Sequence, residues 1–142
     1  MIFSDTEIRV RYADTDQMKF AYYGKFFEYF EQGRSDLLRQ IGMPYPELEQ
    51  MGYYLPVIEA HARYRKSARY DDLLIVRTVL RDPPQVRVRI EYEVRLRDGE
   101  VLAEGYTVHS FLNAENGRPT RAPEEFLRSV AEKMAGTGPI KR

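Results

Sequence analysis

The fold is decided by the stretch GKFFEYFEQGRSDLLRQI, residues 24–41. Apolar or small side chains recur in it at helical spacing and form one stripe: Phe26, Phe30, Gly33, Leu37 and Ile41. Most of the charged side chains lie elsewhere on the helical wheel. Gly42 and Pro44 then supply a stop signal. The stretch predicts a long amphipathic helix from about residue 24 to residue 41, in which Gly33 lets the backbone approach a sheet.

After this helix the hydrophobic period changes from about 3.6 residues to 2. One short helical turn, residues 46–51, comes first. From Val86 to Leu96 apolar and charged side chains alternate without a break, so one face of this strand is core and the other is wet. Strands are predicted over residues 6–12, 55–64, 73–82, 86–97 and 101–112, the last two joined by an Asp98-Gly99 hairpin turn.

A second helix is predicted to begin at Pro123, with an apolar stripe that runs to Met134. The order β, long α, four β, α indicates an α+β fold. A largely antiparallel sheet of about five to six strands wraps around the long central helix, and a short C-terminal helix follows. We expect residues 1–135 to form a single domain and residues 136–142 a flexible C-terminal tail.

The composition excludes several classes of function. Cysteine is absent from the 142 residues, which removes thiol catalysis and thiolate metal sites. The 22 basic and 22 acidic residues cancel, which argues against a nucleic-acid or membrane-surface binder. Neither a membrane span nor an export signal is indicated, so a cytoplasmic protein is the default expectation.

The charge is nevertheless uneven along the chain. Residues 63–97 contain ten Lys or Arg residues and five Asp or Glu residues. Two interpretations compete: a solvated sheet face with Arg at every second position, or a surface that binds an anionic ligand.

Two carboxylates, Asp14 and Asp16, lie close together in the loop YADTDQMKFAYYG, residues 12–24. As a metal site they offer too few ligands, because no His, Asn or third carboxylate adjoins them. As a purely structural feature they would make an Asx turn or cap a helix. The third interpretation is catalytic.

Support for the catalytic interpretation comes from the helix that begins about seven residues after Asp16. A helix N-terminus presents free N–H groups and a positive dipole end, which stabilise a developing oxyanion. An aspartate opposite such an end, in a pocket lined by Phe20, Tyr22, Tyr23 and Phe26, has the parts for acyl transfer. A thioester, whose leaving group is good, suits so sparse a site better than an amide.

Three motifs stand out in the first part of the chain: Tyr12-Ala-Asp-Thr-Asp16, Tyr22-Tyr23 and residues 27–34. Together with the weaker motifs at residues 64–72 and 117–123, they resemble hotdog-fold acyl-CoA thioesterases of the 4-hydroxybenzoyl-CoA thioesterase type. The resemblance covers nearly the whole domain. It implies that Asp16 is the nucleophile or general base and that the Tyr23 backbone N–H polarises the thioester carbonyl. It also implies a homodimer or homotetramer, sheets joined edge to edge, with the substrate between subunits and no metal or cofactor.

The chain departs from the family pattern at two positions. Many relatives have Gly where this chain has Lys19, and one bacterial branch has His where it has Tyr23. A side-chain role for that His therefore does not apply here. Lys19 either crowds the loop or offers a cation to the ligand.

Substrate contacts are expected from two groups of residues. Phe20, Tyr22 and Phe26 would line the acyl pocket. Arg65, Lys66 and Ser67, in the region of densest positive charge, would attract the phosphates of coenzyme A, although surface solubility explains them equally well. Of the two histidines, His61 and His109, neither is assigned a role, because a lone strand histidine is usually packed and hydrogen-bonded.

Two rival functions remain open on the sequence. One is hydrolysis of acyl groups carried on acyl carrier protein, whose acidic surface would suit the local basic excess. The other is a non-catalytic module that binds acyl-CoA without turnover. A hotdog dehydratase is disfavoured, because that chemistry usually relies on a histidine beside the acidic residue.

Overall fold

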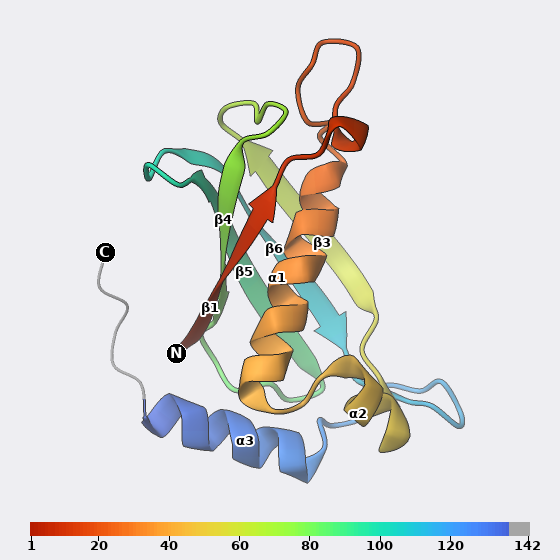
Figure 1. Ribbon diagram of the computed structural model, residues 1–142. Helices are drawn as coiled ribbons and strands as arrows, with labels where there is room; N and C mark the ends of the chain where they lie inside the picture. Colours follow the sequence, from red (N-terminus) through yellow and green to blue (C-terminus); the bar gives the residue numbers. More distant parts are fainter. Residues whose placement is uncertain (137–142) are drawn as a thin grey trace.

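The computed structural model describes residues 1–136 (Figure 1). The expected flexible tail therefore lies, except for Gly136, outside the described residues. The strands are β1 (Ile2–Arg9), β2 (Tyr53–Tyr54), β3 (Val57–Tyr64), β4 (Leu73–Leu80), β5 (Arg87–Leu96), β6 (Val101–Ser110) and β7 (Leu112–Asn113). The helices are α1 (Lys25–Ile41), α2 (Tyr45–Gln50) and α3 (Glu124–Ala135), with a 3₁₀ turn, η1, at Tyr12–Asp14.

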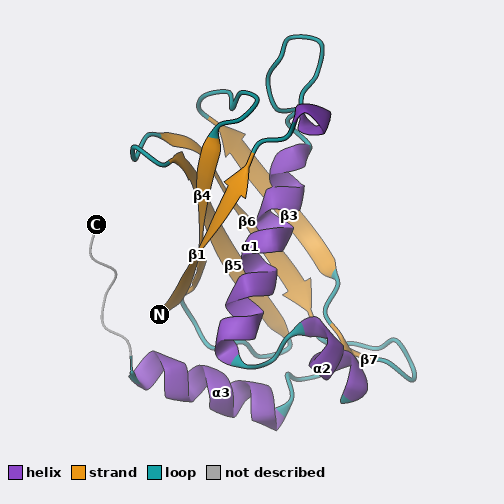
Figure 2. Ribbon diagram, in the orientation of Figure 1, coloured by secondary structure: helices purple, strands orange, loops and turns teal. Residues whose placement is uncertain are grey.

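Five strands form one antiparallel sheet in the order β1-β4-β5-β6-β3, so β1 and β3 are its edges. A small antiparallel pair, β2 with β7, stands apart from it. Helix α1 lies along the concave face of the sheet, and α3 crosses below one end (Figure 2). The predicted α+β arrangement, a sheet wrapped around one long helix, is confirmed.

Helix α1 packs on the sheet through the predicted stripe, and all five of its residues are buried. Gly33 permits the closest approach, because a Cβ there would lie 2.3 Å from Thr78 Oγ1 and 3.0 Å from Val76 Cγ1 on β4. The helix starts one residue later than predicted and ends at Gly42, whose φ of +91° closes it in the left-handed conformation.

The first strand was predicted over residues 6–12, which is wrong by several residues, since β1 spans Ile2–Arg9. Its core-facing positions include the polar Ser4 and Thr6, both buried. Because these two positions are polar, the sequence shows no apolar alternation over this strand. Thr6 Oγ1 donates a hydrogen bond to Asp36 Oδ2 on α1 at 2.7 Å, which satisfies the buried hydroxyl.

The remaining elements agree with the prediction to within a few residues. Helix α3 starts directly after Pro123 and buries Phe126, whose ring packs against Phe111 at 5.3 Å. The pairing of Tyr53–Tyr54 with Leu112–Asn113 was not predicted. No helix within residues 1–136 is long and apolar enough to span a membrane.

Candidate active site

Asp16 sits in a tight loop that folds back on itself between β1 and α1. Its backbone N–H donates to the Phe20 carbonyl at 2.9 Å, and its carbonyl accepts from the Lys19 N–H at 2.9 Å. Its carboxylate Oδ1 accepts the Met18 N–H at 2.9 Å, which makes an Asx turn. The side chain is half-buried, and its other carboxylate oxygen accepts no hydrogen bond from residues 1–136.

The turn after Asp16 requires a left-handed backbone, because Lys19 has a φ of +67°. Such a conformation costs an L-residue with a Cβ about 1–2 kcal/mol and costs glycine almost nothing. This gives a physical reason for the glycine that we noted at this position in the resembling family. Lys19 keeps the same turn at a higher conformational cost.

Asp14 is buried, with 3% of its surface exposed, and its carboxylate accepts hydrogen bonds that stabilise the turn. Its Oδ2 accepts hydrogen bonds from the Arg11 N–H at 3.0 Å and the Tyr29 hydroxyl at 3.1 Å, and its Oδ1 accepts from Arg11 Nη2 at 3.1 Å. Burial alone would raise the pKa of Asp14, but these hydrogen bonds outweigh it and the pKa lies below its usual value. No group of three or more metal-ligating side chains exists within residues 1–136.

Within residues 1–136, the start of α1 leaves two backbone donors beside this loop without a hydrogen bond, the N–H groups of Tyr23 and Gly24. The Tyr22 N–H donates to the Asp14 carbonyl at 2.8 Å, whereas the N–H of Tyr23 takes part in no hydrogen bond within residues 1–136. The carbonyl of Tyr23 accepts from Phe26 N–H and from the Tyr64 hydroxyl. A free amide at a helix N-terminus is a ready donor for an anion.

A groove with a volume of about 260 Å³ lies between the start of α1 and the end of β3, and Tyr23 is one of its lining residues. Figure 1 shows both ends at the same extremity of the molecule. Its lining brings together most of the predicted site residues: Tyr23, Phe26, Arg65, Lys66 and Ser67, joined by Ala21 and Tyr64. Phe26 is nearly fully buried and packs edge-on against Tyr64 at 5.2 Å.

Three predicted site residues do not line this groove: Asp16, Phe20 and Tyr22. Phe20 lies under the guanidinium of Arg69, 5.5 Å from it, and the ring of Tyr22 packs on that of Tyr23 at 4.5 Å. The structure therefore places these three outside the lining of the groove.

The two predicted phosphate-binding cations already have partners in the chain. Arg65 forms an ion pair with Glu104, and Lys66 forms one with Glu100, which raises the pKa of Lys66. The two cations are more than half exposed, and the two glutamates are partly exposed. An anionic ligand at this end of the groove would compete with those carboxylates.

Sequence reasoning missed two tyrosines that adjoin the site. Tyr64 ends β3 and bonds to the Tyr23 carbonyl, and Tyr29 lies on α1 and bonds to Asp14. Tyr29 is only 2% exposed and packs in the core like the aromatic residues of the α1 stripe. Nothing in its sequence position reveals the polar partner, because that partner lies in the preceding loop.

His109 is fully buried and acts as a structural hydrogen-bonding residue. Its Nε2 lies 2.8 Å from Thr107 Oγ1 and its Nδ1 lies 3.2 Å from the Leu55 carbonyl. Burial lowers the pKa of His109 to about 4, so the ring is neutral at physiological pH. His61, by contrast, stacks on Tyr106 at the surface.

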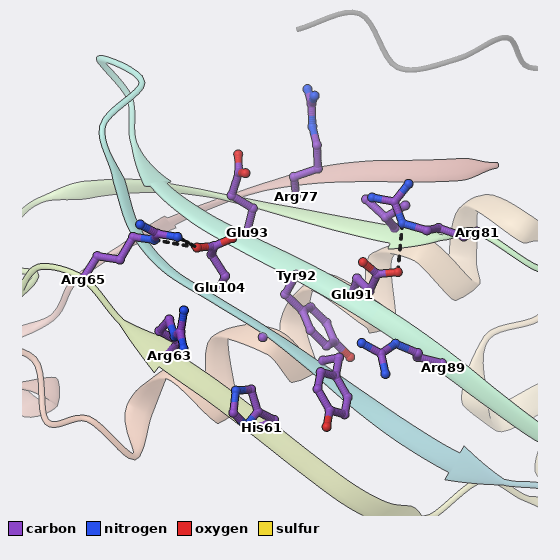
Figure 3. A pocket seen from close by; sticks show the side chains of 13 residues that line it. His61, Arg63, Arg65, Arg77, Arg81, Arg89, Glu91, Tyr92, Glu93 and Glu104 are labelled. Atoms are coloured by element: carbon purple, nitrogen blue, oxygen red, sulfur yellow. Dashed lines mark hydrogen bonds and ion pairs between the residues drawn. The ribbon is translucent and has the colours of Figure 1, made fainter.

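A second, larger hollow of about 360 Å³ lies on the face of the sheet that turns away from α1 (Figure 3). Arg65 alone among its lining residues belongs to the predicted site. Two of its glutamates, Glu91 and Glu104, pair with arginines of the same hollow, and Arg89 covers the Tyr106 ring at 3.8 Å. Five arginines and three glutamates line the hollow, so part of the basic excess predicted from the sequence remains on this face.

The comparison with known proteins agrees with this geometry. Residues 10–130 match the thioesterase-like superfamily. The chain belongs to this superfamily. The Bacillus subtilis protein YneP, provisionally named an acyl-CoA thioesterase, is 29% identical to this thioesterase-like chain over 126 residues, which cover 89% of the chain and 91% of YneP.

Solved structures of related proteins establish the fold. A DHNA-CoA thioesterase from Staphylococcus aureus superposes with a TM-score of 0.88 and 29% identity, over 95% of this chain and 93% of its own. A hypothetical protein from Thermus thermophilus has a TM-score of 0.85 and 36% identity, over 91% and 98% of the two chains. The expected hotdog fold of this thioesterase-like protein is therefore confirmed.

Proposed function

We propose that this protein hydrolyses acyl-CoA thioesters to the free acid and coenzyme A, with Asp16 as nucleophile or general base and the Tyr23 amide as oxyanion donor. The observation that carries the proposal is that the N–H of Tyr23, a residue lining the groove at the start of α1, takes part in no hydrogen bond within residues 1–136. The names of the Staphylococcus aureus and Bacillus subtilis relatives agree with a CoA thioester as substrate.

Tyr23 and Asp16 would have separate roles in the reaction. The thioester carbonyl oxygen would accept the Tyr23 N–H, which stabilises the negative charge that develops there. The Asp16 carboxylate would either attack the carbonyl carbon or take a proton from the water that attacks it. The C–S bond then breaks, and the coenzyme A thiolate leaves and is protonated. On the nucleophilic route the acyl group is then a mixed anhydride with Asp16, and water hydrolyses it to release the free acid and restore the carboxylate.

The substrate would be held from both ends of the groove. Phe26 and Tyr64 offer an apolar wall for the acyl group, whereas Phe20 and Tyr22 do not line the groove. Arg65, Lys66 and Ser67 lie at the end where the pantetheine and phosphates of coenzyme A would extend into solvent.

We also propose that two copies pair through β3, as the resemblance implies, and that the substrate lies between them. β3 is a sheet edge, and nearly all of its residues are exposed, including the apolar Val57 and Ile58. An open edge of this kind invites pairing with another strand. A second copy there would cover the open side of the groove next to Tyr64.

The pairing is tested by dilution. Activity per chain should fall on dilution at the same concentrations at which sedimentation velocity shows dissociation. Full activity in a monomer would refute the pairing.

The function is tested by Asp16→Asn against wild type, with free thiol release followed for a panel of acyl-CoA esters. Asp82→Asn is the matched control, because Asp82 is an exposed carboxylate two residues after the end of β4 and lines no part of the groove. We expect D16N to lose turnover and D82N to retain it. A folded D16N with an unchanged rate would falsify the assignment of Asp16.

The same assay separates the rival functions. Acyl carrier protein esters tested beside the CoA esters show which carrier is used. Calorimetry that finds tight binding of the intact ester without thiol release would indicate a binding module instead of an enzyme.

A further inference from the structure

The hydroxyl of Tyr29 forms a buried hydrogen bond across the gap between α1 and the loop that carries Asp16. It donates to Asp14 Oδ2 at 3.1 Å, and both residues are at most 3% exposed. Tyr29 lies in the second turn of α1, and its ring packs edge-on against Phe26 at 5.5 Å. The bond therefore joins a rigid part of the helix to the loop.

Asp14 in turn connects to both halves of the candidate site. Asp16 follows it by two residues along the chain. The Asp14 carbonyl accepts the Tyr22 N–H at 2.8 Å, which fixes the backbone directly before Tyr23. A shift of Asp14 would thus move the carboxylate of Asp16 and the amide of Tyr23 relative to each other.

We propose that Tyr29 is a positioning residue that acts through Asp14 to hold the Asp16 carboxylate and the Tyr23 amide in their reactive arrangement. The inference rests on the proposed function. Tyr29 touches neither the substrate nor the reacting atoms, because it lies beneath the loop and lines no part of the groove.

The other groups that face Asp14 do not replace this link. Arg11 belongs to the same loop, and 70% of its side chain is exposed, so it does not tie the loop to the helix. Lys25 comes from α1, but its Nζ is 4.0 Å from Asp14 Oδ1 and also pairs with Glu28 at 3.0 Å. Burial raises the pKa of Tyr29, which keeps the hydroxyl protonated as a donor.

The expected effect is on turnover and not on substrate binding. Displacement of a reacting group by about 1 Å costs on the order of a hundredfold in rate. With Arg11 still bonded to Asp14, loss of the tyrosine hydroxyl should displace the loop less, so we expect kcat to fall roughly tenfold while KM stays within about twofold of wild type.

The test is Tyr29→Phe, which keeps the ring and its packing on Phe26. The matched control is Tyr92→Phe, which also removes a buried hydroxyl, the one 2.6 Å from Thr107 Oγ1, on a strand that contributes nothing to the groove. We expect Y29F to lose kcat and Y92F to retain it at a similar cost in thermal stability. Equal kcat values in Y29F and wild type, or equal losses in the two variants, would overturn the inference.

Two further measurements keep the proposal falsifiable. Asp14→Asn weakens the same link from the other side, so Y29F combined with D14N should be no slower than D14N alone. Additive losses would show that Tyr29 acts by another route. Hydrogen exchange of the Tyr22 amide should be faster in Y29F than in Y92F. Equal exchange rates would again refute the positioning role of Tyr29.

The same kinetic assays distinguish a failure of the proposed function from a failure of the role proposed for Tyr29. A wild-type protein that releases no thiol from any acyl-CoA overturns the function, and the catalytic role of Tyr29 with it. An active wild type and an inactive D16N beside a fully active Y29F overturn only the role of Tyr29.

Discussion

The hydroxyl of Tyr64, at the end of β3, donates a hydrogen bond to the backbone carbonyl of Tyr23 at 2.8 Å. This contact joins the edge strand of the sheet to the start of α1, 41 residues away in sequence. It restrains the backbone on one side of Tyr23, while the Tyr22–Asp14 hydrogen bond restrains it on the other. The proposed oxyanion donor is therefore held from both directions.

Tyr64→Phe should lower kcat, because it removes one of these two restraints and leaves the ring against Phe26. A neutral hydrogen bond is worth about 0.5–1.5 kcal/mol, which corresponds to a loss of roughly twofold to tenfold in rate. Steady-state kinetics measure this loss. Tyr54→Phe, on the separate β2–β7 pair, is the control and should match wild type.

Glu100→Gln should lower the KM for acyl-CoA, because it frees Lys66 for the phosphates of the substrate. The ion pair is exposed, so the expected gain is at most about fivefold and should shrink as salt is added. Glu115→Gln, an exposed carboxylate in the turn after β7, is the matched control. A KM that does not respond to E100Q would remove Lys66 from the binding site.

Lys19→Gly should stabilise the protein by up to about 1 kcal/mol, because it relieves the left-handed backbone at φ +67°. Lys19→Ala removes the same charge and keeps the strain, so it should leave stability unchanged. Denaturant unfolding distinguishes the two variants. Equal stability in K19G and K19A would show that the turn is not strained.

Gly33→Ala should destabilise the protein by about 1–3 kcal/mol, because the added Cβ meets Thr78 Oγ1 at 2.3 Å. Thr78→Ala removes the colliding hydroxyl. In a double-mutant cycle the two changes together should cost less than their sum, since they share one contact. Simple additivity would place the clash elsewhere.

Stability should fall between pH 6.5 and pH 4 through His109. Its pKa is about 6.5 when unfolded and about 4 when buried, so in that range the unfolded chain binds the extra proton. The contribution of His109 to the free energy of unfolding is on the order of 3 kcal/mol. It is fully present above pH 6.5 and is lost as the pH falls toward 4. Urea unfolding of wild type and His109→Gln at several pH values measures it, and equal slopes would refute it.

The spacing of apolar residues in the sequence was sufficient to predict the elements that bury apolar side chains. The stripe from Phe26 to Ile41 and the alternation from Val88 to Val94 are both buried as predicted. Strand β1 was misplaced because Ser4 and Thr6 face the core, where their hydroxyl groups break the apolar pattern. Hydrophobic period detects apolar burial and is blind to polar burial.

The candidate site was predicted as two groups of residues, each close in sequence, and the groove brings Tyr23 and Phe26 of one group together with Arg65, Lys66 and Ser67 of the other. Tyr23 and Phe26 lie one helical turn apart, and the groove contains both. The bonds of Tyr29 to Asp14 and of Tyr64 to Tyr23 depend on how the loop and β3 are placed in space. No local pattern encodes such contacts, and the ion pairs that occupy Arg65 and Lys66 escaped prediction for the same reason.

The pairing of β1 with β4 also has a consequence for how the chain is made. Residues 2–9 pair with residues 73–80, and β6 ends only at Ser110. On the ribosome α1 therefore emerges before four of the five strands that cover it. Its apolar side stays exposed while most of the domain is being translated, so we expect the sheet to close late and nascent chains to need protection from aggregation until then.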